Sequence, residues 1–133
     1  MGYLQYGFKK TLDNTTFDDA VGQATSALKA EGFGVLTEID VRKTLKSKLD
    51  VDFRRYTILG ACNPTLAKQA LDAEAHIGLL LPCNVVIQEA PEKGVIVSIA
   101  DPREMFALVE NSAVQPVAKE AGRRLRRVVA SLR

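Results

Sequence analysis

ILGACNPTLAKQALDAEAHIGLLLPCNVVIQE, residues 58–89, follows the pattern of a strand, a helix and a second strand. Residues 55–61 predict the first strand. Asn63 and Pro64 then predict a helix start, because Asn caps the free N–H groups of a first turn and Pro is tolerated there. Residues 77–89 form a second apolar run and predict the next strand.

A hairpin and two helices are predicted after this stretch. APEKG, residues 90–94, leads into a strand over 94–100, and Gly94 suits the positive φ that a tight turn needs. Asp101 and Pro102 repeat the combination of cap and proline at a helix start. The final segment predicts a long helix, because one of its sides is apolar: Val114, Val117, Ala118, Ala121, Leu125, Val128 and Leu132.

Two strands and two helices are predicted before this stretch. Residues 4–12 alternate between apolar and polar positions and predict a strand with one apolar face: Leu4, Tyr6, Phe8 and Leu12. Thr15 or Thr16 caps the helix that follows. After a strand over 33–41, VRKTLKSKLDV, residues 41–51, predicts a short helix with an inward apolar side: Val41, Leu45 and Leu49.

These elements predict one α+β domain. We expect about five strands, mostly antiparallel where hairpins join them, with the helices packed on one face of the sheet. No linker or low-complexity segment divides residues 1–133, which indicates a single domain. The patterns do not specify the order of the strands.

The composition is that of an ordinary globular protein, with 47% apolar and 26% charged residues. No run of about 18 apolar residues occurs, so we expect no membrane span. The N-terminal segment lacks the basic and apolar parts of a secretory signal, and we therefore expect a cytoplasmic protein. The net charge of +2 is too small to indicate a nucleic-acid-binding protein.

Few residues are suited to holding a metal or a cofactor. The chain has two cysteines, Cys62 and Cys83, and a single histidine, His76. The cysteines form no CxxC pair, and a zinc site would need carboxylates or another subunit. No P-loop, GxGxxG, GxSxG or HExxH motif is present. We therefore expect no metal and no cofactor, and the sequence assigns no catalytic residue.

Cys62 and Cys83 stand at predicted strand ends, each beside an asparagine and near a proline. Alternation places both thiols on the more apolar side of their strands. One interpretation is structural, because free cysteines are usually small core residues and Asn63 serves as a helix cap. The other is functional: Cys62 precedes a helix N-terminus, which favours a thiolate or a bound anion, and polar corners at strand ends often line ligand pockets.

The functional interpretation leads to two hypotheses. The first is a small ligand bound where the ACNP and LPCN motifs form a corner, with these candidate binding residues: Cys62, Asn63, Pro64, Pro82, Cys83 and Asn84. The alternative is thiol redox chemistry or sulfur transfer by Cys62 and Cys83. That chemistry needs Cα atoms closer than about 7 Å and at least one accessible sulfur.

Residues 58–89, with TEIDVRKTLKSKLDVDFRRY before them, closely resemble the domain-of-unknown-function 302 family. The resemblance covers most of the chain and rests on the paired ACNP and LPCN motifs at this spacing. It implies a small α+β domain and a homodimer, and it implies no established activity. It also marks the six candidate residues as family positions without assigning them a role.

Three further groups are interpreted as ordinary surface residues. His76 falls in a predicted loop without a nucleophile motif nearby, and Glu38 and Asp40 share a solvated strand face. The C-terminal segment contains five arginines that complement the end of a helix dipole: Arg123, Arg124, Arg126, Arg127 and Arg133. No aromatic side chain for base stacking accompanies them, so weak nucleic-acid binding is the lowest-ranked function.

Overall fold

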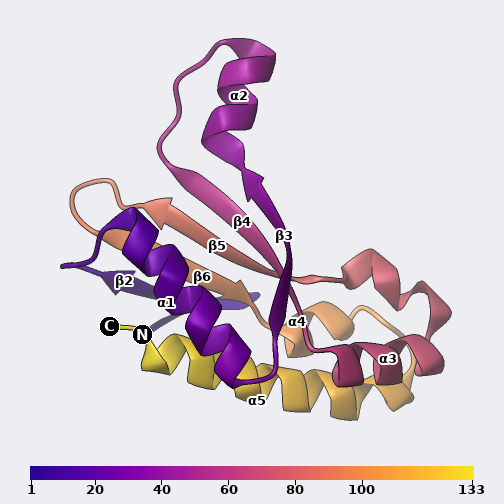
Figure 1. Cartoon of the computed structure of the whole chain (residues 1–133). Helices are drawn as coiled ribbons and strands as arrows, with labels where there is room; N and C mark the ends of the chain where they lie inside the picture. Colours follow the sequence, from indigo (N-terminus) through magenta and orange to yellow (C-terminus); the bar gives the residue numbers. More distant parts are fainter.

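A computed structural model describes the whole chain, Met1–Arg133. Six strands form one antiparallel sheet in the order β1-β2-β6-β5-β4-β3 (Figure 1). They are β1 (Gly2–Leu4), β2 (Gly7–Leu12), β3 (Gly34–Asp40), β4 (Tyr56–Cys62), β5 (Cys83–Glu89) and β6 (Val95–Ala100). The predicted α+β class with mostly antiparallel strands is confirmed.

The two long helices, α1 (Phe17–Ala30) and α5 (Gln115–Ser131), pack on one face of the sheet (Figure 1). The shorter elements gather at the end of the sheet where β4 ends: α3 (Pro64–Ala73), α4 (Pro102–Phe106) and the 3₁₀ helices η1 (Ala75–Leu80) and η2 (Ser112–Val114). None of the helices has both the length and the apolar character that crossing a bilayer requires.

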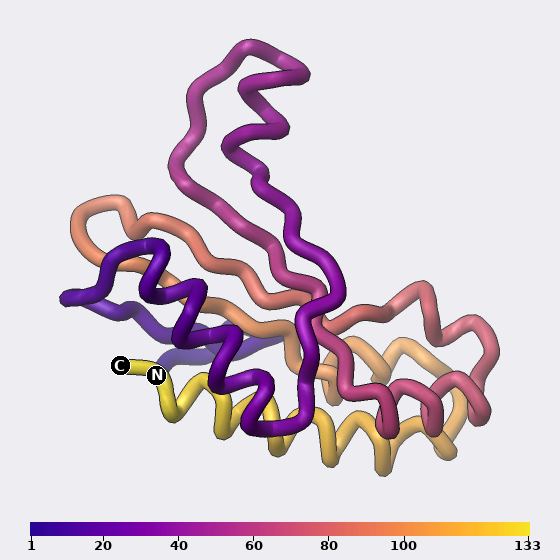
Figure 2. The backbone as a smooth tube through the Cα atoms, viewed as in Figure 1, coloured from indigo at the N-terminus to yellow at the C-terminus, as the bar shows by residue number.

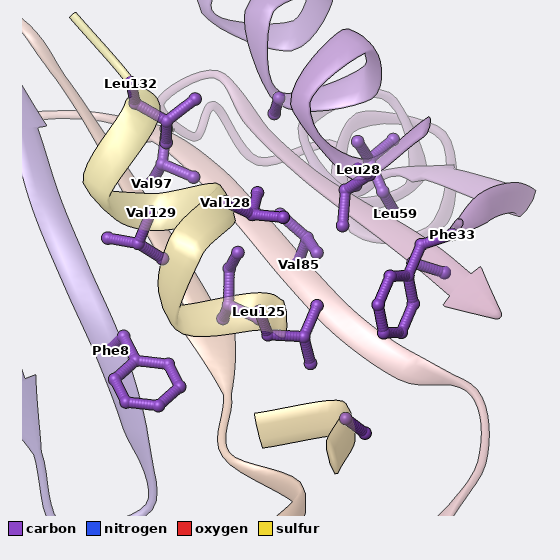
Figure 3. Close-up of a cluster of buried hydrophobic side chains, with 14 of the residues drawn as sticks. Phe8, Leu28, Phe33, Leu59, Val85, Val97, Leu125, Val128, Val129 and Leu132 are labelled. Carbon is purple, nitrogen blue, oxygen red and sulfur yellow. The ribbon is translucent and has the colours of Figure 1, made fainter. Parts of the chain in front are cut away.

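The hydrophobic core lies between the sheet and the two long helices (Figure 3). Leu125 and Val128 of α5 point toward the sheet, where Val85 of β5 lies beneath them, and Leu132 lies beside Val97 of β6. The apolar side predicted for the C-terminal segment is confirmed, because all of its members are buried: Val114, Val117, Ala118, Ala121, Leu125, Val128 and Leu132.

The helix caps that the sequence predicted are formed at three helices. Thr16 caps α1, Asn63 caps α3 and Asp101 caps α4, and each accepts a hydrogen bond of 3.0–3.1 Å from a backbone N–H of the first turn. The sequence predicted Thr15 or Thr16 as the N-cap of α1, and in the structure the cap is Thr16. Gly94 has a φ of +89°, as the predicted hairpin turn requires.

Residues 4–12 belong to two strands rather than to the single one predicted. A turn at Gln5 and Tyr6 separates β1 from β2, and Tyr6 is 61% exposed instead of sharing the apolar face. Phe8 and Leu12 do face the core. The alternation of apolar and polar residues does not reveal this turn, because Gln5 is polar and Tyr6 is apolar, as the next two positions of a strand would be.

The strand predicted over 77–89 begins only at Cys83. Residues 75–80 form η1 instead, in which Ile77 is buried and Leu79 is 87% exposed. A short run of apolar residues fits either a strand or a partly buried helical turn, and periodicity alone does not separate the two.

The helix predicted over 41–51 is α2 (Val41–Leu49), but it stands away from the body of the protein (Figures 1 and 2). We call this projection the arm, residues 40–55, because it joins the ends of β3 and β4. No residue of α2 is buried, and Leu49 is 65% exposed. The prediction of an inward apolar side is therefore wrong for the single chain.

Gly60 in β4 lets the segment before β5 lie close to the sheet. A Cβ atom on Gly60 would lie 2.8 Å from Cγ of Pro82 and closer still to the hydroxyl of Thr37. Both contacts are shorter than van der Waals packing allows, so a side chain here would push Pro82 away.

We expect Gly60→Ala to reduce the free energy of unfolding by about 1–3 kcal/mol, the usual cost of overpacking a tight site. Thermal unfolding followed by circular dichroism measures this change. Gly34→Ala in β3 is the matched control, because a Cβ atom there has no neighbour within 4 Å. Equal melting temperatures for the two variants would contradict the expectation.

Candidate ligand pocket

The ACNP and LPCN motifs lie side by side at one end of the sheet. β4 ends at Cys62 and β5 begins at Cys83. The two strands are antiparallel neighbours, with Ala61 opposite Cys83 and Gly60 opposite Asn84. Antiparallel pairing therefore brings the end of the first motif's strand to the start of the second.

A cavity of about 130 Å³, which we call the larger cavity, lies beside the LPCN motif. One wall is the segment from η1 to the start of β5, and the other is the junction of β6 with α4. Its lining side chains are mostly apolar and include no charged group: Leu79, Leu80, Leu81, Pro82, Cys83, Asn84, Ala100, Pro102, Met105 and Phe106.

A smaller cavity of about 20 Å³ is lined by the first three residues of the ACNP motif, Ala61, Cys62 and Asn63, together with residues of α3 and α5. A space of this size holds about one water molecule. Leu81, Cys83, Pro102 and Phe106 line both cavities, so the two spaces adjoin. Both motifs therefore border the same region of the protein.

Five of the six candidate residues line these cavities: Cys62, Asn63, Pro82, Cys83 and Asn84. Pro64 lines neither, because it occupies the exposed first turn of α3. The side-chain oxygen of Asn63 already accepts the N–H of Leu66 at 3.1 Å. Asn84 is exposed, and its amide can offer both a donor and an acceptor to a ligand.

The two cysteines differ in whether they follow the buried positions of their strands, although both line the smaller cavity. Cys83 shares the buried side of β5 with Val85 and Ile87, as predicted. Cys62 does not share the buried side of β4, which consists of Thr57, Leu59 and Ala61. The prediction for Cys62 was wrong because both sides of β4 are apolar, so residue type does not reveal which side faces the helices.

Burial raises the pKa of both thiols. The pKa of Cys83 rises from 9.0 to about 11, mainly through burial and further through the nearby Cys62. The pKa of Cys62 is also raised by burial. Both thiols are therefore mainly protonated near neutral pH, and the raised pKa of Cys62 gives no sign of the thiolate that a helix N-terminus would favour.

The other titratable candidates lie away from the cavities. His76 is exposed on η1, and Glu38 is exposed on β3. Asp40 caps α2 by accepting the N–H of Lys43 at 2.9 Å. No three His, Cys, Asp or Glu side chains are arranged to hold a metal ion.

The arginines of α5 bind mainly within the chain. Arg127 Nε lies 3.1 Å from both carboxylate oxygens of Glu31, at the end of α1, and the contact lowers the pKa of Glu31. Arg126 donates to the hydroxyl of Tyr3 in β1 at 2.6 Å. Two further arginines of α5 pair with Glu120 of the same helix. The predicted solvated end of the helix therefore also makes side-chain contacts with the end of α1 and with β1.

Part of the larger cavity comes from residues that the sequence did not single out. Ala100, Pro102, Met105 and Phe106 reach it because β6 pairs with β5 and leads directly into α4. The Asp101-Pro102 pair reveals the start of a helix but not its neighbour in space. No sequence signal places α4 beside the LPCN motif.

The fold and the cavities define a small α+β domain with a single antiparallel sheet and an apolar corner pocket. The chain belongs to the family described as "Domain of unknown function DUF302", whose model matches residues 8–132. The crystal structure of an uncharacterized conserved protein DUF302 from Bacillus stearothermophilus has a similar fold, with a TM-score of 0.88 at 24% identity, covering 98% of this chain and 100% of that one. No curated protein matches the chain.

We expect Cys83 to react slowly with iodoacetamide in the native protein at pH 7.5. Raising the pKa by two units reduces the thiolate fraction about 100-fold, and the greater nucleophilicity of the more basic thiolate recovers about tenfold, so the net rate falls roughly tenfold before any shielding. The rate should rise as the pH approaches the pKa of about 11.

The single-cysteine variants Cys62→Ala and Cys83→Ala make the measurement specific, because each leaves one thiol to follow by mass spectrometry. The same variants in denaturant give the rates of unshielded thiols. If Cys83 reacts as fast in the native chain as in the denatured one at pH 7.5, the thiol is activated, and the sulfur-chemistry hypothesis gains support.

Proposed function

We propose that this protein binds a small neutral ligand in the larger cavity. The observation that carries the proposal is the cavity of about 130 Å³ at the point where the ACNP and LPCN motifs meet. The two Cys-Asn-Pro clusters border the same region rather than two separate parts of a packed core. The larger cavity combines a largely apolar lining with the exposed amide of Asn84.

The volume limits the size of the ligand. An apolar cavity of about 150 Å³ is large enough for benzene, whereas pockets for drug-sized molecules measure about 300–1,000 Å³. The larger cavity therefore suits a single ring, a short branched chain, or the end of a longer molecule that extends into solvent.

The lining limits the chemistry of the ligand. Seven of the ten lining residues are hydrophobic, and none is charged. A charged ligand group would lose its hydration without gaining a counter-charge, which is unfavourable in an apolar site. Asn84 and the protonated thiol of Cys83 supply the polar contacts. An apolar body with one hydrogen-bonding group fits this arrangement.

Thiol redox chemistry or sulfur transfer by Cys62 and Cys83 is the second candidate. Both thiols border the smaller cavity, which favours cooperation between them. Their raised pKa values oppose it, because the thiolate is the reactive form. Both cysteines are free, which suits the reducing cytoplasm that we propose as the location. Nucleic-acid binding by α5 ranks below both, since its arginines already have partners.

Titration of the ¹⁵N-labelled protein with phenol and with indole tests the proposal. Both probes are single or fused rings with one hydrogen-bonding group. We expect saturable shifts in the amide resonances of residues 79–84 and 100–106, on the two walls of the larger cavity.

Ala100→Leu fills the cavity and should abolish these shifts. Ala107→Leu is the matched control, because Ala107 is exposed and lies outside the cavity lining. Binding that persists in Ala100→Leu, or the absence of saturable shifts with both probes in the unmodified protein, would rule out the larger cavity as a site for this class of ligand.

A further inference from the structure

The face of the sheet opposite α1 and α5 is unusually apolar for a surface in contact with water. An antiparallel sheet with one solvated face normally alternates apolar and polar residues. β6 has the sequence VIVSIA, in which Val95, Val97 and Ile99 face the core. Ile96 and Ala100 therefore point to the opposite face, which we call the open face.

Neighbouring strands continue the apolar character of the open face. Strand pairing places Ile39, Ile58 and Val86 in one row across β3, β4 and β5, because directly opposed residues of an antiparallel pair share a face. None of these three residues is buried, and Ile39 is 48% exposed. No charged residue occupies an outward position in β4, β5 or β6.

The arm has an unpartnered apolar side as well. Val41, Leu45 and Leu49 are four residues apart and form one stripe along α2, yet none of them is buried. An isolated helix of nine residues is marginally stable in water and normally depends on packing of its apolar face. The stripe is therefore suited to contact with another surface.

We infer that the open face and the apolar stripe of the arm together form the interface of a homodimer. The occupant is a second copy of this chain, related by a two-fold axis, so that each copy contributes the same surface. This inference depends on no ligand, although Ala100 belongs both to the open face and to the lining of the larger cavity. It assigns the contact to the open face and the arm rather than to a sheet edge or to α5.

The distribution of charge favours a second copy over a charged partner. In a two-fold interface each surface meets its own duplicate, so a charged centre would repel itself, whereas an uncharged apolar centre is compatible with itself. Three of the four basic residues of α2, Arg42, Lys43 and Lys46, lie off the stripe, and Lys48 borders it. Arg54 hydrogen-bonds Gln88 at 2.9–3.0 Å at the border of the open face. The charges, with Lys9 of β2 at the end of the same row, therefore border an apolar centre.

The dimensions also fit a dimer. Five strands of about six residues give a face of roughly 24 by 20 Å, or about 480 Å². A helix of nine residues adds a strip of about 14 by 10 Å. The sum approaches the roughly 800 Å² that each partner buries in a standard stable interface. The arm brings the total to about 620 Å², which is closer to that area than the sheet face alone.

Multi-angle light scattering after size exclusion tests the inference on the full chain at micromolar concentration. We expect a mass of about twice the 14.5 kDa of one chain. Val86→Glu places a charge at the centre of the open face, and Leu45→Glu places one on the arm. Each should yield a monomer. Leu45→Glu also tests the interface without disturbing the core, because α2 has no buried residue.

Leu71→Glu is the matched control. Leu71 is an exposed leucine of α3, which packs beside α5, and its replacement should leave the dimer intact. Circular dichroism confirms that each variant keeps its fold. A monomeric unmodified protein would overturn the inference and leave the surface to a different partner. Dimers in both Val86→Glu and Leu45→Glu would overturn it too.

Discussion

The pairing of β4 with β5 is the interaction on which the rest of the structure depends. Ala61 lies opposite Cys83 and Gly60 opposite Asn84, so the two motifs meet at one end of the sheet. A shift of one residue in this register would turn the buried side of β5 toward solvent. Gly60 keeps the register compatible with Pro82, since any larger residue would collide with the proline ring. The helices and both cavities are arranged around this pair of strands.

A second feature is that the central strands are apolar on both sides. One side packs against α1 and α5 and forms the core, and the other side is the open face. This two-sided character explains why alternation misplaced Cys62. It also supports interpreting the arm and the open face together, as one surface that a second copy of the chain covers. The apolar side of α2 is then consistent with its sequence, although the single chain leaves it unburied.

The starts of helices and the tight turn were predictable because they depend on a few adjacent residues. Asn63 and Asp101 cap their helices whatever the distant chain does, and Gly94 supplies a backbone conformation that other residues disfavour. The apolar side of α5 was predictable for a similar reason, because a helix repeats its face within a single segment. The turn at Tyr6 and the 3₁₀ helix over 75–80 were not, because apolar order alone fits more than one local structure.

The sequence by itself determined the α+β class, the helix caps, the hairpin and the two motifs that mark the candidate site. Only the tertiary structure decided the order of the strands, the contribution of α4 to the larger cavity and the projection of the arm. The physical reason is the range of the interactions. Caps and helix faces depend on residues within one or two turns of a helix. The larger cavity instead requires β5 to pair with β6, and the projection of the arm depends on where the rest of the chain lies. Such relations between distant segments leave no periodic signal in the chain.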